Sequence, residues 1–248
     1  NCSTFRKAGS LLPVNLISSL KQLETGVLDL LFPPRCVGCG SSGSFLCTPC
    51  LSALPYLLSP LCTKCGKPLS YGTICYDCEK HPFTFDGIRS LSPYHGVVRQ
   101  AILQFKYQNV KALAVPLAQL MGTYINSHSL PADTLVPVPL HPRRLRERGY
   151  NQSSLLSREL SGLVSLPVVE GALLRARNTP AQTKTNSAQD RHSNVAGAFT
   201  CRGRRVVGKR ILLIDDVCTS GATLNACATA LKSEGAISVW GLTMARDV

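Results

Sequence analysis

The sequence predicts an α/β protein in which a mainly parallel sheet is flanked by helices and preceded by a small Cys-rich module. Eight of the 12 Cys fall within 43 residues as four Cys-x-x-Cys pairs. After about residue 84, strand-like and helical segments alternate, which is typical of a parallel sheet covered on both faces. The apolar stretches are far shorter than the roughly 20 residues of a membrane span, so we expect a protein that does not cross a membrane. We divide the chain into residues 1–33, 34–83 and 84–248.

Residues 1–33 are expected to contain an amphipathic helix over Val14–Leu31. Its apolar residues recur at helical spacing. They are Leu16, Leu20, Leu23, Val27, Leu30 and Leu31. We expect this helix to pack on the body of the protein, and a helix for a partner or a membrane surface is the alternative. The start of the chain lacks the ordered regions of a signal peptide, so we expect a cytoplasmic protein, either free or peripheral to the inner face of the membrane.

The Cys-rich module, residues 34–83, has the pattern of a double zinc ribbon. Its pairs are Cys36/Cys39, Cys47/Cys50, Cys62/Cys65 and Cys75/Cys78. A tight Cys-x-x-Cys turn directs both sulfurs at one ion, and Gly40 and Gly66 let the backbone fold beneath it. Tetrahedral zinc takes four ligands, so eight Cys predict two structural zinc sites. The sequential assignment, with the first two pairs in one site, is the simplest, and an interleaved assignment stays open. Disulfides or a redox pair fit less well, because disulfides suit a secreted scaffold and a redox centre needs one pair rather than four.

Residues 84–248 are expected to form the alternating strands and helices. The predicted strands are Ile88–Tyr94, Thr134–Pro139, Arg210–Val217 and Ile237–Ala245. The predicted helices are Val97–Tyr107, Ala112–Asn126, Ser153–Leu163 and Ala222–Ser233, the last stopped by Gly235. We expect an Arg-rich loop after the second strand and a further loop over Asn178–Asn194, where hydrophobic residues are scarce.

The formal net charge of +13 is concentrated in one part of the chain. Between Leu140 and Arg210 there are 14 Lys or Arg and only 4 Asp or Glu. Such a concentration attracts polyanions such as phosphate esters, pyrophosphate or nucleic acid. A solvated surface is the alternative explanation, although surfaces usually intersperse both signs.

One strand–turn–helix segment carries the candidate chemistry. The apolar strand Ile211–Ile214 runs into Asp215 and Asp216, and small residues then lead into a helix. Those small residues include Thr219, Ser220, Gly221, Ala222 and Thr223. Ligands of open parallel sheets bind beyond the C-terminal ends of the strands, where a helix N-terminus suits a phosphate and carboxylates accept the hydroxyls of a cis-diol. A ribose 5-phosphate that bears a pyrophosphate would satisfy these groups and the basic stretch together. An ordinary buried strand before a capped helix is the alternative.

These motifs resemble those of known proteins. The strand–turn–helix segment is similar to the binding signature of the type I phosphoribosyltransferases, which use phosphoribosyl pyrophosphate with Mg²⁺. The run Val136-Pro-Val-Pro-Leu-His-Pro142, the run Arg175-x-Arg-Asn-Thr179 and the four Cys pairs resemble the ComF family, over about residues 34–246. The resemblance implies a type I phosphoribosyltransferase-like domain behind a double zinc ribbon, with two structural Zn²⁺ ions and a Mg²⁺ that accompanies the ligand.

The resemblance also implies roles for individual residues. Asp215 and Asp216 would hold the ribose hydroxyls, and residues 219–223 would cradle the 5-phosphate. The residues implied to contact pyrophosphate are His141, Arg143 and Arg144. The stretch Asn178–Asn194 would be a mobile loop that closes over the site. Residues implied to move inward on closure are Arg175, Gln182 and Arg191. The implied catalytic residues are Asp215, Asp216, Arg175 and Arg191.

The ComF resemblance implies a role in natural competence, the uptake and inward movement of single-stranded DNA. Our first hypothesis is a protein that binds phosphoribosyl pyrophosphate and single-stranded DNA, with a competence helicase as a candidate partner. Four aromatic residues would stack bases, unless they belong to the core. They are Tyr71, Tyr76, Phe83 and Phe85. The alternative is an active phosphoribosyltransferase with a nitrogen acceptor, working by electrostatic stabilisation of an oxocarbenium-like centre and of the departing pyrophosphate, assisted by Mg²⁺. A glutamine-using amidotransferase fits poorly, because the sequence offers no glutaminase region.

Overall fold

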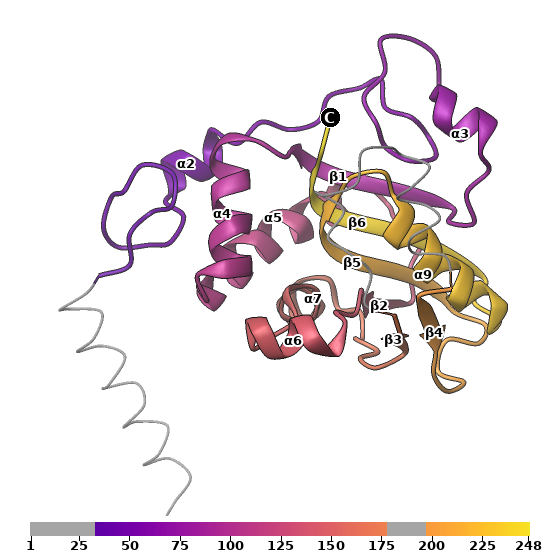
Figure 1. Ribbon diagram of the computed structural model, residues 1–248. Helices are drawn as coiled ribbons and strands as arrows, with labels where there is room; N and C mark the ends of the chain where they lie inside the picture. The colour runs from indigo at the N-terminus through magenta and orange to yellow at the C-terminus, as the bar shows by residue number, and fades with distance from the viewer. Residues whose placement is uncertain (1–32, 178–196) are drawn as a thin grey trace, which may run out of the picture.

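The computed structural model describes residues 33–177 and 197–248. Its centre is a four-stranded sheet in the order β1-β6-β5-β2, with every neighbouring pair parallel (Figure 1). The strands are β1 (Gly87–Pro93), β2 (Thr134–Pro137), β5 (Arg210–Cys218) and β6 (Ser238–Arg246). The four apolar residues 211–214 of β5 are fully buried, as a strand covered on both faces requires.

Helices cover both faces of this sheet (Figure 1). The elements on one face are α4 (Gly96–Tyr107), α5 (Ala114–Ser127), which follows the 3-10 turn η1 (Lys111–Leu113), and α7 (Gln152–Val164). Those on the other face are α9 (Ala222–Ser233) and the antiparallel pair β3 (Leu173–Arg175) and β4 (Phe199–Cys201). Leu212 and Ile214 join the core that contains α4 and α5, whereas Ile211 and Leu213 join the core that contains α9. This division follows from the two-residue period of a strand.

The Cys-rich module contributes two short helices, α2 (Thr48–Ser52) and α3 (Tyr76–Lys80), which lie well apart in Figure 1. The first half of the module packs on α4, because a Cβ added at Gly38 would lie 3.1 Å from Val97. The second half packs on β1, where the Ile88 N–H donates to the carbonyl of Lys64 at 2.8 Å. Both halves of the module therefore contact the elements of the α/β sheet.

The predicted α/β class with a Cys-rich module in front is confirmed. Helix α9 has the predicted bounds, and the other predicted strands and helices of residues 84–248 agree within two residues. The helix expected over Val14–Leu31 and the loop expected over Asn178–Asn194 lie outside the described residues. None of the helices in the two described ranges is long and apolar enough to cross a membrane.

The Arg-rich loop expected after β2 is wrong, because this segment forms helix α6 (Pro142–Arg148). Pro142 occupies the first turn, where it suits a helix start, and His141 is the N-cap, whose Nδ1 accepts from the Arg143 N–H at 3.2 Å. Gly149 ends the helix with φ +76°, a conformation that favours glycine. The pair β3–β4 was also not predicted, since each strand has only three residues and its partner lies far along the chain.

Candidate functional site

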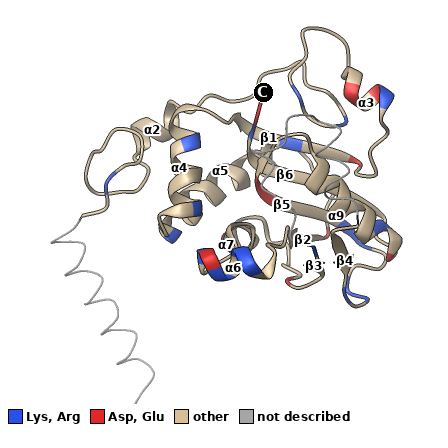
Figure 2. Ribbon diagram, viewed as in Figure 1, with Lys and Arg blue, Asp and Glu red and all other residues tan. Residues whose placement is uncertain are grey.

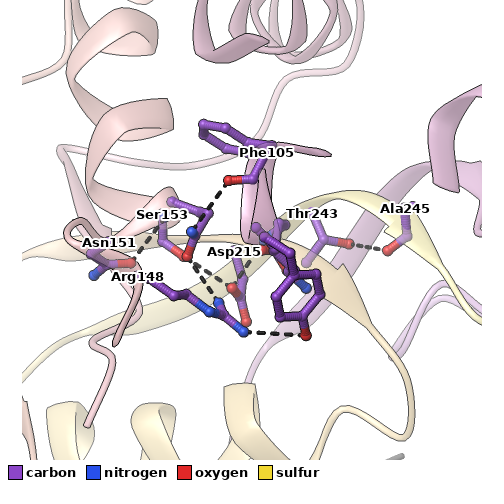
Figure 3. Close-up of polar contacts among 11 residues, drawn as sticks. Phe105, Arg148, Asn151, Ser153, Asp215, Thr243 and Ala245 are labelled. Atoms are coloured by element: carbon purple, nitrogen blue, oxygen red, sulfur yellow. Dashed lines mark hydrogen bonds and ion pairs between the residues drawn. The ribbon is translucent and has the colours of Figure 1, made fainter. Parts of the chain in front are cut away.

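The carboxylates at the end of β5 are held by hydrogen bonds. Asp215 Oδ1 accepts from Ser153 Oγ at 2.9 Å and from the Asp216 backbone N–H at 2.9 Å. Ser153 lies in the first turn of α7, after the N-cap Asn151, whose Oδ1 accepts from the Ser153 N–H (Figure 3). Asn151 Nδ2 in turn donates to the carbonyl of Val138 at 3.0 Å. The start of α7 therefore fixes the orientation of Asp215.

Asp216 forms an ion pair with Lys106, in the last turn of α4. Lys106 Nζ lies 2.7 Å from Asp216 Oδ1, and both side chains are largely buried, with 17% and 9% of their surfaces exposed. Burial lowers the pKa of Lys106, but the charge and hydrogen bond of Asp216 outweigh it and raise this pKa above its ordinary value. The lysine is therefore a fixed positive charge beside the carboxylate pair.

Asp215 titrates in a different range from an ordinary aspartate. Burial, and next the neighbouring Asp216 charge, raise the pKa of Asp215 to about 7, although Lys106 acts in the opposite direction. A buried pair of carboxylates with one lysine carries less charge when one proton is held, which is the physical cause of the shift. The pair can thus exchange a proton with a ligand or solvent near neutral pH.

The turn after the carboxylates leads directly into α9. Gly221 is the helix N-cap and adopts φ +80°, and a Cβ at this position would lie 3.3 Å from Ile88 Cδ1. The Ala222 N–H donates to Ser220 Oγ at 3.4 Å. Thr219 and Thr223 flank this N-terminus in the chain, so residues 219–223 combine hydroxyl groups with the positive end of a helix dipole. Such a terminus suits a phosphate.

Cys218, which precedes this turn, is a buried residue of β5 rather than an exposed thiol. Burial raises its pKa to about 11. A thiol that stays protonated at neutral pH is a poor nucleophile, so we assign Cys218 no catalytic role.

The two arginines expected to contact pyrophosphate, Arg143 and Arg144, lie in different surroundings. Arg143 lies on the exposed side of α6, where its Nε pairs with Glu147 Oε1 at 3.0 Å. Arg144, by contrast, is within electrostatic reach of Arg175 on β3. Burial lowers the pKa of Arg175, and so does the charge of Arg144, whereas Asp215 raises it. Arg175 is thus within electrostatic reach of both Arg144 and Asp215, while Arg191 and Gln182 lie outside the described residues.

A cleft with a strongly basic lining opens beside Lys106 and is bordered by residues of α4 and α6. We call it the basic cleft, and its volume is about 630 Å³. Its lining residues are Lys106, Tyr107, Asn109, Lys111, Arg144, Arg146, Glu147, Arg148 and Gly149. Blue segments mark Lys and Arg at the end of α4 and along α6 (Figure 2). Among the residues that the structure describes, Glu147 is the one acidic side chain in this lining. The Tyr107 ring is 68% exposed, and the Arg148 guanidinium lies 5.0 Å from its centre.

The eight Cys of the module form two separate clusters, and each cluster has the sulfur arrangement that zinc requires. The clusters are Cys36, Cys39, Cys47 and Cys50, and Cys62, Cys65, Cys75 and Cys78, as the sequential assignment predicts. Within each, the sulfur atoms lie within 4.8 Å of one another. Cys39 and Cys47 have sulfurs 3.6 Å apart, as have Cys65 and Cys75. The edge of a sulfur tetrahedron with Zn–S bonds of about 2.3 Å is about 3.8 Å, so both clusters fit a zinc ion.

Backbone N–H groups support the thiolates of both zinc sites. The N–H groups of Gly38 and Cys47 each donate to Cys36 Sγ at 3.4 Å. In the second site the N–H of Cys65 donates to Cys62 Sγ at 3.5 Å, and that of Cys75 donates to the same sulfur at 3.4 Å. Hydrogen bonds to ligand atoms orient them and stabilise their charge. The two halves of the module therefore repeat one arrangement.

Three residues of this site were not found from the sequence: Lys106, Ser153 and Arg246. Arg246 is the last residue of β6 and is 3% exposed, with Nη1 donating to the carbonyl of Thr219 at 3.0 Å. Lys106 and Ser153 look like ordinary polar residues of amphipathic helices, so no local signal marks them. An arginine at the end of an apolar strand was a usable signal, because charged residues are seldom buried without a partner.

Comparisons with known proteins agree with these features. A family model described as "Double zinc ribbon domain" matches residues 27–79. Competence protein F of Haemophilus influenzae is 32% identical over 225 residues, covering 85% of this chain and 97% of that protein. Competence protein ComFC of Bacillus subtilis is 28% identical and covers 82% of this chain and 84% of that protein. The DNA utilization protein YhgH of Escherichia coli K12 is 31% identical over 73% of this chain and 83% of that protein.

Solved structures that resemble part of this chain in backbone fold include an amidotransferase and a phosphoribosyltransferase. Glutamine phosphoribosylpyrophosphate amidotransferase from B. subtilis has 18% identity and a TM-score of 0.39, covering 56% of this chain and 30% of that chain. Adenine phosphoribosyltransferase from Leishmania donovani has 14% identity and a TM-score of 0.35, covering 55% of this chain and 53% of that chain. This chain thus spans less than a third of the amidotransferase and about half of the adenine enzyme. With its two zinc sites and its similarity to competence protein F over almost the whole of that relative, the chain belongs to the ComF family.

Proposed function

We propose that this protein binds phosphoribosyl pyrophosphate at the C-terminal end of β5. The observation that carries the proposal is the direct succession of two adjacent carboxylates, of which Asp216 is buried, a turn with φ +80° at Gly221 and the N-terminus of α9. The ribose hydroxyls would donate to Asp215 and Asp216, and the 5-phosphate would accept from backbone and hydroxyl groups of residues 219–223. Arg175 interacts electrostatically with both Asp215 and Arg144, and the two arginines would attract the pyrophosphate.

A Mg²⁺ ion would bind together with the pyrophosphate. The donor set fits this ion, since Asp215 and Asp216 supply carboxylate oxygens and the ligand supplies phosphate oxygens, the donors that Mg²⁺ prefers. When bound, the ion would neutralise part of the pyrophosphate charge. Lys106 holds Asp216 in place through their ion pair, and Ser153 does the same for Asp215 through its hydrogen bond.

Isothermal titration calorimetry tests the proposal. Phosphoribosyl pyrophosphate with Mg²⁺ should bind the purified protein at one site per chain. Asp215→Asn and Asp216→Asn should each weaken binding by about tenfold or more, because a charge-assisted hydrogen bond contributes about 1.5–3 kcal/mol. Asp247→Asn is the matched control, since Asp247 is an exposed carboxylate just beyond β6. Equal affinities for all four proteins would overturn the proposal.

We also propose that the basic cleft binds single-stranded DNA. Five cations from the described part of the chain line the cleft. Lys106 pairs with Asp216, and we assign Arg144 to the pyrophosphate. The cations that we assign to DNA phosphates are therefore Lys111, Arg146 and Arg148. The exposed ring of Tyr107 offers a base a stacking surface at the same cleft. Of the aromatic residues considered for stacking elsewhere, Phe85 is 1% exposed and packs 4.7 Å from Phe83, so it belongs to the core.

Fluorescence anisotropy with a labelled oligothymidine tests the cleft. The double variant Lys111→Ala/Arg146→Ala should bind more weakly, and its slope of log affinity against log salt should fall by about 1.4, at roughly 0.7 for each phosphate that is no longer neutralised. Arg202→Ala/Arg204→Ala removes the same charge from an exposed loop elsewhere and is the matched control. An equally weakened affinity in both double variants would show general attraction and overturn the assignment to the cleft.

Turnover is the alternative to binding alone. A cavity of about 690 Å³ lies beside Arg175 and His141 and is lined largely by apolar side chains, including Leu145, Leu155 and Leu174. A cavity of this size is large enough to take a small acceptor molecule. Pyrophosphate release, measured with ammonia or free bases as acceptors and with or without single-stranded DNA, distinguishes an enzyme from a binding protein. Release that depends on Asp215 and on one acceptor would establish the transferase.

A further inference from the structure

Arg246 joins the second zinc site to the turn that begins the proposed phosphate cradle. It ends β6, and its side chain is buried. Its Nη1 donates to the carbonyl of Thr219 at 3.0 Å, and its Nη2 donates to the carbonyl of the zinc ligand Cys65. One guanidinium therefore bonds two segments that lie more than 150 residues apart in the chain.

The charge of Arg246 needs compensation, because a buried cation without a counter-charge is strongly destabilising. No ion pair within residues 33–177 and 197–248 includes Arg246. The neighbouring group with negative charge is the second zinc site, since four thiolates around Zn²⁺ carry a formal charge of −2. Arg246 does interact electrostatically with Cys65 of this site.

Packing supplies a second connection between the same two places. The Ile88 N–H of β1 donates to the carbonyl of Lys64, between two zinc ligands, and a Cβ at Gly66 would lie only 2.5 Å from the Ile88 carbonyl oxygen. The side chain of Ile88 faces the turn, where its Cδ1 would lie 3.3 Å from a Cβ at Gly221. Strand β1 therefore contacts both the second zinc site and the turn, as Arg246 does.

Among the described residues, the first zinc site has no comparable connection to the turn. Gly38 beside it faces Cys50 and Val97 of α4, and the apolar residues Val37, Phe45 and Leu51 pack on the α4–α5 core. The two sites have the same ligands but different neighbours. Variants of the first zinc site can therefore serve as controls for variants of the second.

We propose that the second zinc site positions the turn 219–223 through Arg246, so that zinc binding there and sugar-phosphate binding at the turn are coupled. Arg246 is a positioning residue, since it acts on the turn through the Thr219 carbonyl and not on the ligand. The identity of the ligand rests on the proposed function, while the link between zinc site and turn does not.

Hydrogen exchange and calorimetry on the zinc-loaded protein test the coupling. In Arg246→Gln the zinc ligands are intact, so two zinc ions per chain should remain. The rate of amide hydrogen exchange should rise in residues 219–223 and stay unchanged in α5. The affinity for phosphoribosyl pyrophosphate should fall roughly tenfold, because a hydrogen bond from a charged donor is lost. Cys75→Ser/Cys78→Ser should have both effects, and Cys47→Ser/Cys50→Ser should have neither.

A measurement on the unaltered protein covers the case in which the cysteine variants fail to fold. Coupling between two binding sites is reciprocal. The test is a zinc titration against a competing chelator. Phosphoribosyl pyrophosphate should raise the zinc affinity of the second site by the same factor by which zinc at that site raises the affinity for phosphoribosyl pyrophosphate. The zinc affinity of the first site should not change.

The outcomes separate this inference from the proposed function. If the wild-type protein binds no phosphoribosyl pyrophosphate, the proposed function is overturned, and the exchange measurement, which needs no ligand, still decides the coupling. If the ligand binds but Arg246→Gln leaves both its affinity and the exchange of residues 219–223 unchanged, the coupling is overturned and the proposed function stands.

Discussion

Lys106 Nζ lies 2.7 Å from Asp216 Oδ1, and this ion pair joins the last turn of α4 to the C-terminal end of β5. The two residues come from opposite ends of the α/β domain in sequence, yet they are largely buried against each other. The pair sets the charge balance of the proposed site, because it leaves Asp215 as the carboxylate that exchanges a proton near neutral pH. Lys106 also lines the basic cleft, so one lysine borders both proposed binding places.

Removal of Lys106 should destabilise the protein strongly. Lys106→Gln leaves the Asp216 carboxylate buried without its partner, which should lower the free energy of unfolding by about 3–5 kcal/mol. Arg158→Gln is the control, since Arg158 and Glu170 form an exposed pair whose loss should cost below about 1 kcal/mol. Urea unfolding measures both. Similar small costs for the two variants would contradict the assigned role of Lys106.

Asp215→Asn should stabilise the protein at alkaline pH. Because the folded-state pKa of Asp215 is about 7 and its ordinary value is 3.8, its contribution to stability is present at acid pH and is lost as the pH rises through 7. Asparagine does not titrate, so the variant should unfold at a higher temperature than the wild type at pH 8 and at about the same temperature near pH 4.

Asp133 is the control for this prediction, because its pKa is shifted in the opposite direction. A hydrogen bond from Arg210, above all, lowers the pKa of Asp133 to about 2. Its contribution to stability is therefore present at neutral pH and is lost as the pH falls through about 2. Asp133→Asn should lower the unfolding temperature at neutral pH. If Asp215→Asn also lowered the unfolding temperature at pH 8, burial would not raise the pKa of Asp215 as we describe.

Gly221→Ala should impair both folding and ligand binding. Its φ of +80° is costly for alanine, and the added Cβ meets Ile88 at 3.3 Å. Gly208→Ala, at φ +69° with open space around the Cβ, has the same backbone strain at another turn. Both variants should lose about 1 kcal/mol of stability. Only Gly221→Ala should also weaken phosphoribosyl pyrophosphate binding, and equal affinities in the two variants would argue against residues 219–223 as the cradle.

Metal analysis of the purified protein should give two zinc ions per chain. Cys39→Ser removes a ligand of the first site only and should reduce the content to one, whereas Cys201→Ser, outside both clusters, should keep two. Chelation should unfold the Cys-rich module, because a segment of this length has little core without metal. A content of two in Cys39→Ser would show that Cys39 is not required for zinc binding and would contradict its role as a ligand of the first site.

Much of the fold could be predicted from local patterns. The bounds of helix α9 are predicted by the small residues that lead into it and by Gly235, which stops it. In the structure both Gly221 and Gly235 adopt a positive φ. The apolar run 211–214 marked a central strand in the same way. Helix α6 was missed because its charged sequence lacks an apolar period, although Pro142 and Gly149 mark its two ends.

The candidate site could be predicted only where its residues are neighbours in sequence. Asp215, Asp216 and the turn that follows form one segment, and each Cys cluster is likewise local. Lys106, Ser153 and Arg246 reach the site from separate elements, and Ser153 is 62 positions from the Asp215 that it bonds. Contacts over such separations arise from the packing of the sheet and its helices, which no short pattern encodes.

A crystal structure of the protein with phosphoribosyl pyrophosphate and Mg²⁺ tests the central claim most directly. The account predicts the 5-phosphate at the amides of residues 219–223 and the ribose hydroxyls within hydrogen-bond distance of Asp215 and Asp216. The account would be contradicted by a ligand bound in the basic cleft that contacts neither residues 219–223 nor the carboxylates of Asp215 and Asp216.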